Sequence, residues 1–134
     1  MAERQIVREI GRTNQGPVGA VKIEFGNMLA RNASGHLVHA ADTAGLVVCG
    51  VCEQTVDNSA GAAGAVKGQY VTGEAYWFSN DGTNPVTAAE LGKSVYVKTS
   101  ASVCVAAGST NSIVAGVAME LSATRGVKIF IGSR

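Results

Sequence analysis

The residues of this chain best suited to chemistry are two cysteines, Cys49 and Cys52, in the sequence CGVC. A C-x-x-C pair carries redox chemistry or half of a zinc site when its sulfurs converge, as at the start of a helix or on a knuckle turn. Here the pair ends LVVCGVC, an apolar run of strand length. Side chains alternate faces along a strand, so a spacing of three predicts opposite faces. We interpret both as structural cysteines that pack as small hydrophobes.

A zinc site would need two further ligands. The remaining cysteine and histidine candidates are Cys104, His36 and His39, and they do not form a second pair with knuckle spacing. The two histidines flank Leu-Val in a predicted hairpin strand, and we interpret them as surface residues. We therefore expect no metal and no cofactor. A small thiol or zinc enzyme built on the two neighbouring cysteines stays open as an alternative.

Other catalytic patterns are not visible in the sequence. Asp42 and Asp57 fall in predicted turns, where carboxylates commonly accept hydrogen bonds from backbone N–H groups. The glycine-rich stretch 57–64 lacks the Lys-Ser or Lys-Thr pair of a phosphate-binding loop. No serine lies in a G-x-S-x-G elbow, and no nucleophile stands beside a base in a convincing context. We expect that the protein is not an enzyme and has no catalytic residues.

The elements that would position these residues are short strands separated by turn signals. Residues 87–91 form the one helical piece, in which Thr87 and Glu90 have the spacing of a capping box. About ten strands and one short helix predict an all-β fold, a small single-domain β-sandwich or β-barrel. The strands are expected at 21–25, 28–31, 36–39, 46–55, 65–71, 73–78, 94–98, 101–106, 112–121 and 126–131. The expected core includes Leu46, Val48, Val95, Val97, Val117, Ile129 and Ile131.

Composition and charge exclude several classes of function. The chain has 134 residues, 16% of them charged, and a formal net charge of +1. Such a balance gives no electrostatic footprint for nucleic acid. No apolar run approaches the roughly 20 residues of a membrane span, and no secretory signal is visible. Three cysteines, an odd number, argue against a disulfide framework and for synthesis in a reducing compartment.

The N-terminal segment differs from the rest of the chain. We predict an extended arm at residues 1–18 and a β-domain at residues 19–134. The arm mixes apolar and basic side chains and ends in the turn cluster TNQGP at 13–17. It could be a frayed terminus, a first edge strand, a strand swapped between copies, or an arm that orders against a partner. Its candidate partner-binding residues are Arg4, Ile6, Val7, Arg8, Ile10 and Arg12.

Three blocks of the sequence resemble a known family. They are DTAGLVVCGVCEQTVDNSAG at Asp42–Gly61, PVTAAELGKSVYV at Pro85–Val97 and AGVAMELSATRGVKIFIG at Ala115–Gly132. In this order and spacing they resemble the small capsid cement, or head decoration, proteins of tailed bacteriophages, over about residues 19–132. The chain departs from the family pattern at the two cysteines of the first block and at Ala89-Glu90-Leu91 in the second.

The resemblance implies a virion structural protein, made in the host cytoplasm, that binds the outer surface of the expanded phage head. It implies the major capsid protein as partner and a staple-like role against the internal pressure of packaged DNA. The low surface charge and alternating apolar strands further predict a homo-oligomer, with a trimer favoured over a dimer. No direct contact with nucleic acid or a membrane is expected.

An alternative from another class is a receptor- or carbohydrate-binding head module. Tyr70, Tyr76 and Trp77 hold much of the aromatic mass of the chain. If these rings were exposed together, they would form a platform on which sugars could stack. The sequence patterns alone do not separate this reading from a decoration protein.

Overall fold

The computed structural model describes residues 13–132, and it confirms the all-β expectation. The twelve strands of these residues build a five-stranded sheet, a closed five-stranded barrel and a two-stranded ribbon. No helix within residues 13–132 is long and apolar enough to cross a bilayer. The strands are β1 (Thr13–Pro17), β2 (Lys22–Ile23), β3 (Met28–Arg31), β4 (Leu37–His39), β5 (Val47–Cys52), β6 (Val56–Asp57), β7 (Lys67–Val71), β8 (Glu74–Asn80), β9 (Ser94–Thr99), β10 (Ser102–Cys104), β11 (Val114–Ser122) and β12 (Gly126–Ile131).

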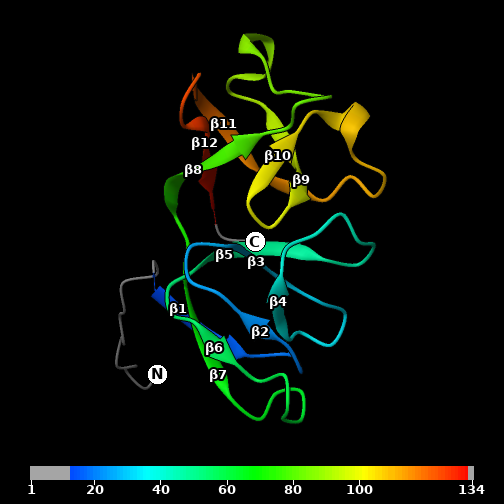
Figure 1. Cartoon of the computed structure of the whole chain (residues 1–134), viewed down its shortest axis with the longest axis vertical. Helices are drawn as coiled ribbons and strands as arrows, with labels where there is room; N and C mark the ends of the chain where they lie inside the picture. Colours follow the sequence, from blue (N-terminus) through cyan, green and yellow to red (C-terminus); the bar gives the residue numbers. More distant parts are fainter. Residues whose placement is uncertain (1–12, 133–134) are drawn as a thin grey trace, which may run out of the picture.

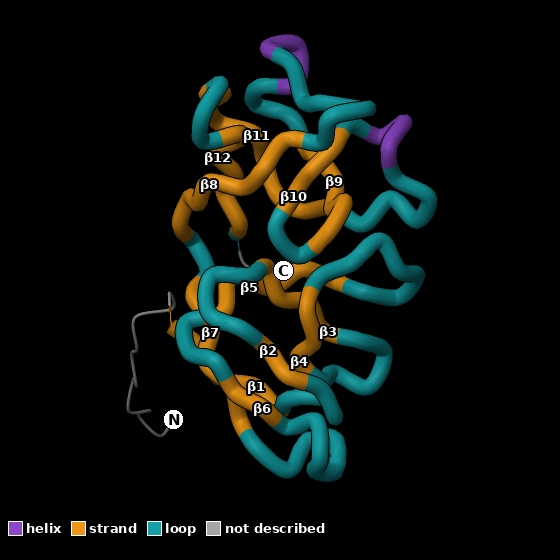
Figure 2. The backbone as a smooth tube through the Cα atoms, viewed as in Figure 1, coloured by secondary structure: helices purple, strands orange, loops and turns teal. Residues whose placement is uncertain are grey.

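The chain divides into two lobes that follow one another in sequence (Figures 1 and 2). Strands β1 to β7 form the first, which we call the sheet lobe, and β8 to β12 form the second, the barrel lobe. Thr72 and Gly73 connect them. The predicted β-barrel is therefore present in the second half, while the first half adds a curled sheet beneath it.

The sheet lobe is a sheet in the order β1-β7-β5-β3-β4, with β2 and β6 as a separate ribbon. The sheet curls until its two outer strands approach each other. Val18, which follows β1, makes an isolated parallel bridge to Leu37 of β4, and the N–H of Gly19 donates to the Leu37 carbonyl at 2.9 Å. The lobe is thus nearly closed.

The barrel lobe closes in the order β10-β8-β12-β11-β9. All neighbours pair antiparallel except β10 and β8, which run parallel at Ser102–Val103 and Ser79–Asn80. Hydrogen-bonded ladders therefore run all the way round, although β10 pairs with only the Ser79–Asn80 end of β8.

Two buried clusters hold the fold together. The main core combines the barrel interior with Met28, Ala30, Val48 and Val51, which lie on the face of the sheet toward the barrel. The sheet thus covers one end of the barrel, and the two lobes share one core. The second core lies inside the curled sheet and consists of Val18, Ile23, Leu29, Leu37, Cys49, Cys52 and Tyr70.

The expected opposite orientation of Cys49 and Cys52 is wrong, because both lie in the second core. The register of β3 against β5 shifts between Leu29 and Ala30, which leaves an extra residue in β5. A β-bulge of this kind breaks the alternation of side chains. Val48 and Val51 consequently share the barrel-facing side.

Five of the seven predicted core residues are buried, and two are corrected. Leu46 packs against the main core but stays half-buried, because it lies in the turn before β5. Val117 is also half-buried. The register of β11 shifts on both sides of Val117, so Ala115 and Ala118 point into the barrel instead.

The predicted short helix is confirmed in position as a single 3₁₀ turn, η1 (Ala88–Glu90), and a second turn, η2 (Ala106–Gly108), follows β10. The carboxylate of Glu90 accepts hydrogen bonds from the Thr87 N–H at 3.0 Å and the Thr87 hydroxyl at 2.8 Å. The cluster at 13–17, predicted as a turn within the arm, is strand β1 instead. Its composition is that of a turn, but its backbone pairs with β7 along all five residues.

Candidate functional site

The candidate site is a groove of about 610 Å³ at the seam between the two lobes. Its floor is a cross-strand row from three neighbouring strands of the sheet lobe. Val71 of β7 pairs with Thr13 of β1 on one side and with Val51 of β5 on the other. We call this space the seam groove. Its ten lining residues are Thr13, Phe25, Gly26, Val51, Cys52, Glu53, Val71, Glu74, Tyr76 and Trp77.

One wall of the seam groove is the start of β8, which carries Glu74, Tyr76 and Trp77. This wall is fixed to the floor because β7 runs into β8 through only two residues. Gly73 has φ +75°, which favours glycine, and its N–H donates to the Ile131 carbonyl at 2.7 Å. The crossing from sheet to barrel is therefore held by the last strand of the barrel.

The opposite wall comes from the turn after β2 and the end of β5. The Phe25 N–H donates to the Thr55 hydroxyl, and the Gly26 N–H donates to the Cys52 carbonyl, both at 2.9 Å. These bonds hold the turn, although the Phe25 side chain is 70% exposed. A large aromatic ring that solvent reaches at the rim of a groove is available for contact with a ligand or partner.

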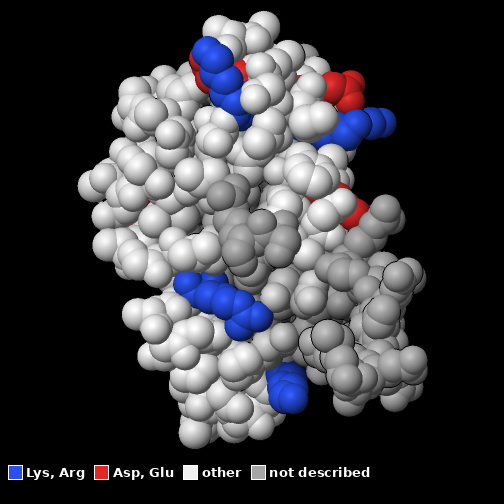
Figure 3. Space-filling model, turned by 180° about the vertical axis from the view of Figure 1, so that it is seen from behind, with Lys and Arg blue, Asp and Glu red and all other residues white. Residues whose placement is uncertain are grey.

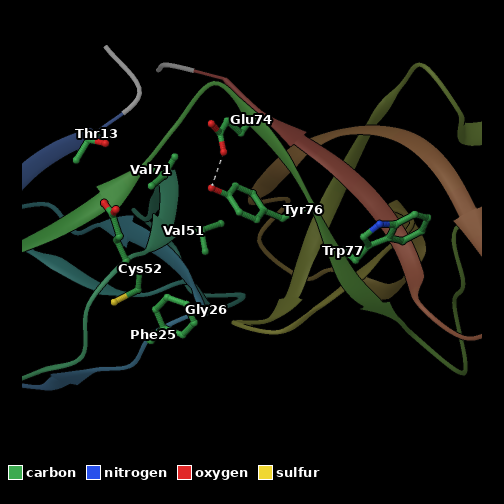
Figure 4. Close-up of a pocket in the computed structure, with 10 residues that line it drawn as sticks. Thr13, Phe25, Gly26, Val51, Cys52, Val71, Glu74, Tyr76 and Trp77 are labelled. Atoms are coloured by element: carbon green, nitrogen blue, oxygen red, sulfur yellow. Dashed lines mark hydrogen bonds between the residues drawn. The ribbon is translucent and has the colours of Figure 1, made fainter. Parts of the chain in front are cut away.

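The seam groove is acidic. Figure 4 shows Tyr76 beside Glu74, and the Tyr76 hydroxyl donates to Glu74 Oε2 at 3.1 Å. Burial, the hydrogen bond to Glu74 and the negative charges of Glu74 and Glu53 together raise the pKa of Tyr76 to about 12. The phenol stays protonated at neutral pH. The groove thus combines two carboxylates, a neutral phenol and apolar surface, an arrangement that suits a cationic or a polyhydroxylic group.

The three aromatic residues of the predicted platform do not lie together. Tyr76 and Trp77 line the seam groove, and Arg125 stacks over the Trp77 ring at 5.7 Å. Tyr70 is buried in the second core, where Arg31 donates to its hydroxyl at 2.9 Å. A platform of all three rings is therefore wrong, because Tyr70 faces the interior of the sheet lobe.

The cysteines are in surroundings that suppress thiol chemistry. Burial raises the pKa of Cys49 to about 11 and also raises the pKa of Cys52 and Cys104. All three are buried free cysteines, and within residues 13–132 no group of three or more His, Cys, Asp or Glu side chains is placed to hold a metal ion. His39, instead of lying free on the surface, accepts the Glu24 N–H at 2.9 Å.

The predicted arm residues lie outside the described residues; they are Arg4, Ile6, Val7, Arg8, Ile10 and Arg12. The chain enters the described part at Thr13, on the floor of the seam groove. Sequence reasoning missed Phe25 and Glu53 as site residues. Phe25 ends an alternating apolar–charged stretch that predicts a strand, whereas the structure places it in an exposed turn after β2.

Comparisons with known protein families, with curated proteins and with solved structures find no significant match to the chain.

Proposed function

We propose that the protein is a capsid decoration protein, a virion structural protein that binds the outer surface of the expanded head of a tailed bacteriophage. The observation that carries this proposal is the resemblance of three ordered blocks, Asp42–Gly61, Pro85–Val97 and Ala115–Gly132, to that family. In the fold these blocks include β5 and β6, η1 and β9, and β11 and β12. The resemblance therefore extends over both lobes and over strands that build the main core.

The proposed role is stabilisation by mass action. A protein that binds the expanded lattice, but not its precursor, stabilises the expanded lattice by its binding free energy at every site. Two lobes that share one core behave as a single stiff body, which suits a staple between neighbouring capsid subunits. Among the described residues on the face shown in Figure 3, charged side chains are few and scattered, which supports packing against a protein surface rather than nucleic acid.

The partner is the major capsid protein, and the N-terminal segment is the proposed anchor. Its aliphatic residues would fill gaps between capsid subunits, and its arginines would pair with carboxylates there. Because β1 begins at Thr13 and pairs with β7, the segment to remove in a test is 2–12 rather than a longer one.

The test is binding to expanded heads that lack the decoration protein. We expect the full chain to co-sediment with these heads and to protect them from heat-induced rupture. The variant without residues 2–12 should keep its circular dichroism spectrum and bind much more weakly. Heads in the unexpanded form are the matched control and should bind neither. Full-strength binding by the truncated variant would contradict the anchor, and no binding by either would contradict the proposed function.

The same reading includes self-association on the virion, and we keep a trimer as the favoured state over a dimer. Light scattering of the free protein and cryo-microscopy of decorated heads would measure it. A strict monomer at high concentration, with isolated single copies on the head, would contradict it.

A second candidate, a carbohydrate- or receptor-binding head module, is favoured by one observation. Phe25, Tyr76 and Trp77 line the same groove as two carboxylates. Aromatic faces and carboxylate acceptors together suit sugar rings and their hydroxyl groups. Free sugars that displace the protein from its target, together with no affinity for expanded heads, would favour this candidate.

A further inference from the structure

We propose that the seam groove is the docking site of the chain's own residues 1–12, so that the protein carries an internal latch on the face where its two lobes meet. This inference concerns the free protein and does not depend on capsid binding, in which the same segment is the proposed anchor. It rests on where the chain enters the groove and on the chemistry of the groove and of the segment.

The position of Thr13 gives the first argument. Thr13 lines the seam groove and pairs with Val71, and β7 then continues through Thr72 and Gly73 into β8, which is the groove wall. The chain that precedes Thr13 therefore starts beside that wall. Twelve residues reach about 40 Å when extended, far more than the groove requires. A segment attached at the edge of its site has an effective concentration of millimolar or more, so modest contacts suffice for docking.

Open strand edge along the groove wall gives the second argument. One side of β8 pairs with β12 over Glu74–Phe78. On its other side β10 pairs with β8 at Ser79 and Asn80, and within residues 13–132 no strand continues that pairing toward the groove. An extended segment can pair its backbone with such an edge, while pockets beside the edge receive its side chains.

Complementary chemistry gives the third argument. The segment offers arginines at 4, 8 and 12 and aliphatic residues at 6, 7 and 10. The groove offers an apolar floor of Val51 and Val71, the Phe25 ring and the carboxylate of Glu53. No hydrogen bond or ion pair to the Glu53 side chain is found within the described part of the chain, although its charge reaches Tyr76. A guanidinium group could pair with that exposed carboxylate.

Trp77 makes the proposal measurable, because it lines the groove and is the single tryptophan of the chain. The experiment compares the full chain with a variant that lacks residues 2–12. Docking predicts that truncation shifts Trp77 emission to longer wavelength and raises its acrylamide quenching constant about twofold. A synthetic peptide of residues 1–12 should bind the truncated variant saturably and reverse both changes. These effects should appear at concentrations where the protein is monomeric.

Two variants test the chemistry. Glu53→Gln should weaken peptide binding about three- to fivefold, as expected for one partly exposed ion pair, whereas Glu90→Gln, at the distant η1 turn, should not change it. Changing Arg4, Arg8 and Arg12 to Gln in the full chain should raise quenching in the same direction as truncation. This second variant keeps β1 and the chain length, so it decides the question if truncation prevents folding.

Several results would overturn the latch. Trp77 emission and quenching that are identical in the full chain, the truncated variant and the triple arginine variant would do so. So would effects of truncation that appear only at concentrations where the full chain is oligomeric, because the groove would then hold the segment of a second copy. Equal binding of a neutral oligosaccharide to the full and truncated chains would also count against it, since a docked segment would compete with the sugar.

Discussion

The barrel lobe and the sheet lobe solve the same problem, the closure of a small β-structure, in different ways. The barrel closes through backbone ladders alone, and its interior is aliphatic apart from Phe78. The outer strands of the sheet lobe are joined by a single bridge instead of a full ladder, and side chains complete the closure. Its core accordingly includes two thiols and a tyrosine hydroxyl beside the aliphatic residues.

Asn58 provides much of the side-chain hydrogen bonding that closes the sheet lobe. Its buried side-chain amide donates to the carbonyls of Val18, Gly19 and Ala62, at 3.3, 3.0 and 2.9 Å. Two of these carbonyls lie just after β1, where the sheet edge approaches β4. One side chain thus supplies hydrogen bonds that a neighbouring strand supplies in the barrel. The closure of the sheet lobe therefore depends on single polar side chains, whereas the closure of the barrel depends on backbone ladders and apolar packing.

The largest effect should come from a charge placed in the barrel. Val97→Asp would bury a carboxylate in the main core, where no partner is at hand, because Val97 is fully buried. We expect a loss of about 5 kcal/mol or more and no soluble folded protein. Soluble yield and circular dichroism measure this. Ser94→Asp, on the exposed side of the same strand, is the control and should fold. A folded Val97→Asp protein would mean that the barrel is not the tightly packed lobe.

Asn58→Ala tests the polar closure of the sheet lobe. It would remove the side-chain donor from three carbonyls, each of which keeps one backbone N–H donor, and should cost about 2 kcal/mol in the free energy of unfolding. The matched change in the barrel lobe is Asn80→Ala, which removes two hydrogen bonds to the backbone of Val86 at a half-buried position. We expect a cost of about 1 kcal/mol there. Urea denaturation measures both, and equal costs would break the comparison.

Gly50→Ala tests the bulge in β5. A Cβ at Gly50 would lie 2.3 Å from the Val71 carbonyl oxygen and 2.9 Å from a ring carbon of Tyr70, so β5 and β7 would have to move apart. We expect a loss of about 1–3 kcal/mol. Gly82→Ala is the control, since a Cβ there meets nothing within 4 Å. Thermal denaturation of the two variants should separate them, and a neutral Gly50→Ala would show that the two strands can adjust.

The three cysteine thiols should react slowly with thiol reagents in both lobes. A pKa of about 11 instead of 9.0 lowers the thiolate fraction of Cys49 at pH 8 about a hundredfold, and burial slows access further. Titration with a chromogenic disulfide should therefore show little reaction in the native protein and three equivalents after unfolding. One equivalent that reacts at once in the native state would reopen the thiol-enzyme alternative.

The smallest effect concerns a contact between the lobes. The Asp42 carboxylate, in the loop before β5, accepts hydrogen bonds from the N–H groups of Thr110 and Asn111 in the loop before β11, at 2.7 and 2.8 Å. These bonds lower the pKa of Asp42 below its ordinary value of 3.8. A lowered carboxyl pKa contributes stability that is present above the ordinary pKa and is lost as the pH falls through the native pKa.

The check is the melting temperature against pH. It should fall below pH 4 in the wild-type protein, and Asp42→Asn should flatten this fall and leave the Tm at low pH almost unchanged. An identical acid profile in both proteins would show that this contact does not couple the lobes. Glu24→Gln serves as the control, because Glu24 is an exposed carboxylate away from the lobe contact.

The sequence predicted a strand well where the strand is marked by its own residues alone, without help from a neighbouring strand. The bounds of β3 and β12 agree with the prediction, because both are apolar runs between clear turn signals. Strand β1 was missed because TNQGP has turn composition and becomes a strand through backbone pairing with β7. The faces of the two neighbouring cysteines were mispredicted because a bulge is a property of two strands in register, which one strand's sequence does not reveal.

The seam groove was beyond sequence reasoning for a related reason. Phe25 and Glu53 are adjacent to the groove only because two turns meet there, and Tyr76 arrives from the other lobe. Contacts of this kind depend on the packing of the lobes. The predicted arm residues, by contrast, came from composition alone, and their role stays a prediction.

The division of the chain into two consecutive lobes has a consequence for the order of events during synthesis. The sheet lobe is complete once β7 has emerged from the ribosome, but its barrel-facing residues Met28, Val48 and Val51 then have nothing to cover them. The barrel closes only when β12 arrives, because β12 is the strand between β8 and β11. Pairing β8 with β12 joins segments about fifty residues apart, which makes closure slow. The nascent chain therefore exposes an apolar face until the last strand is made, and it depends on that interval passing without aggregation.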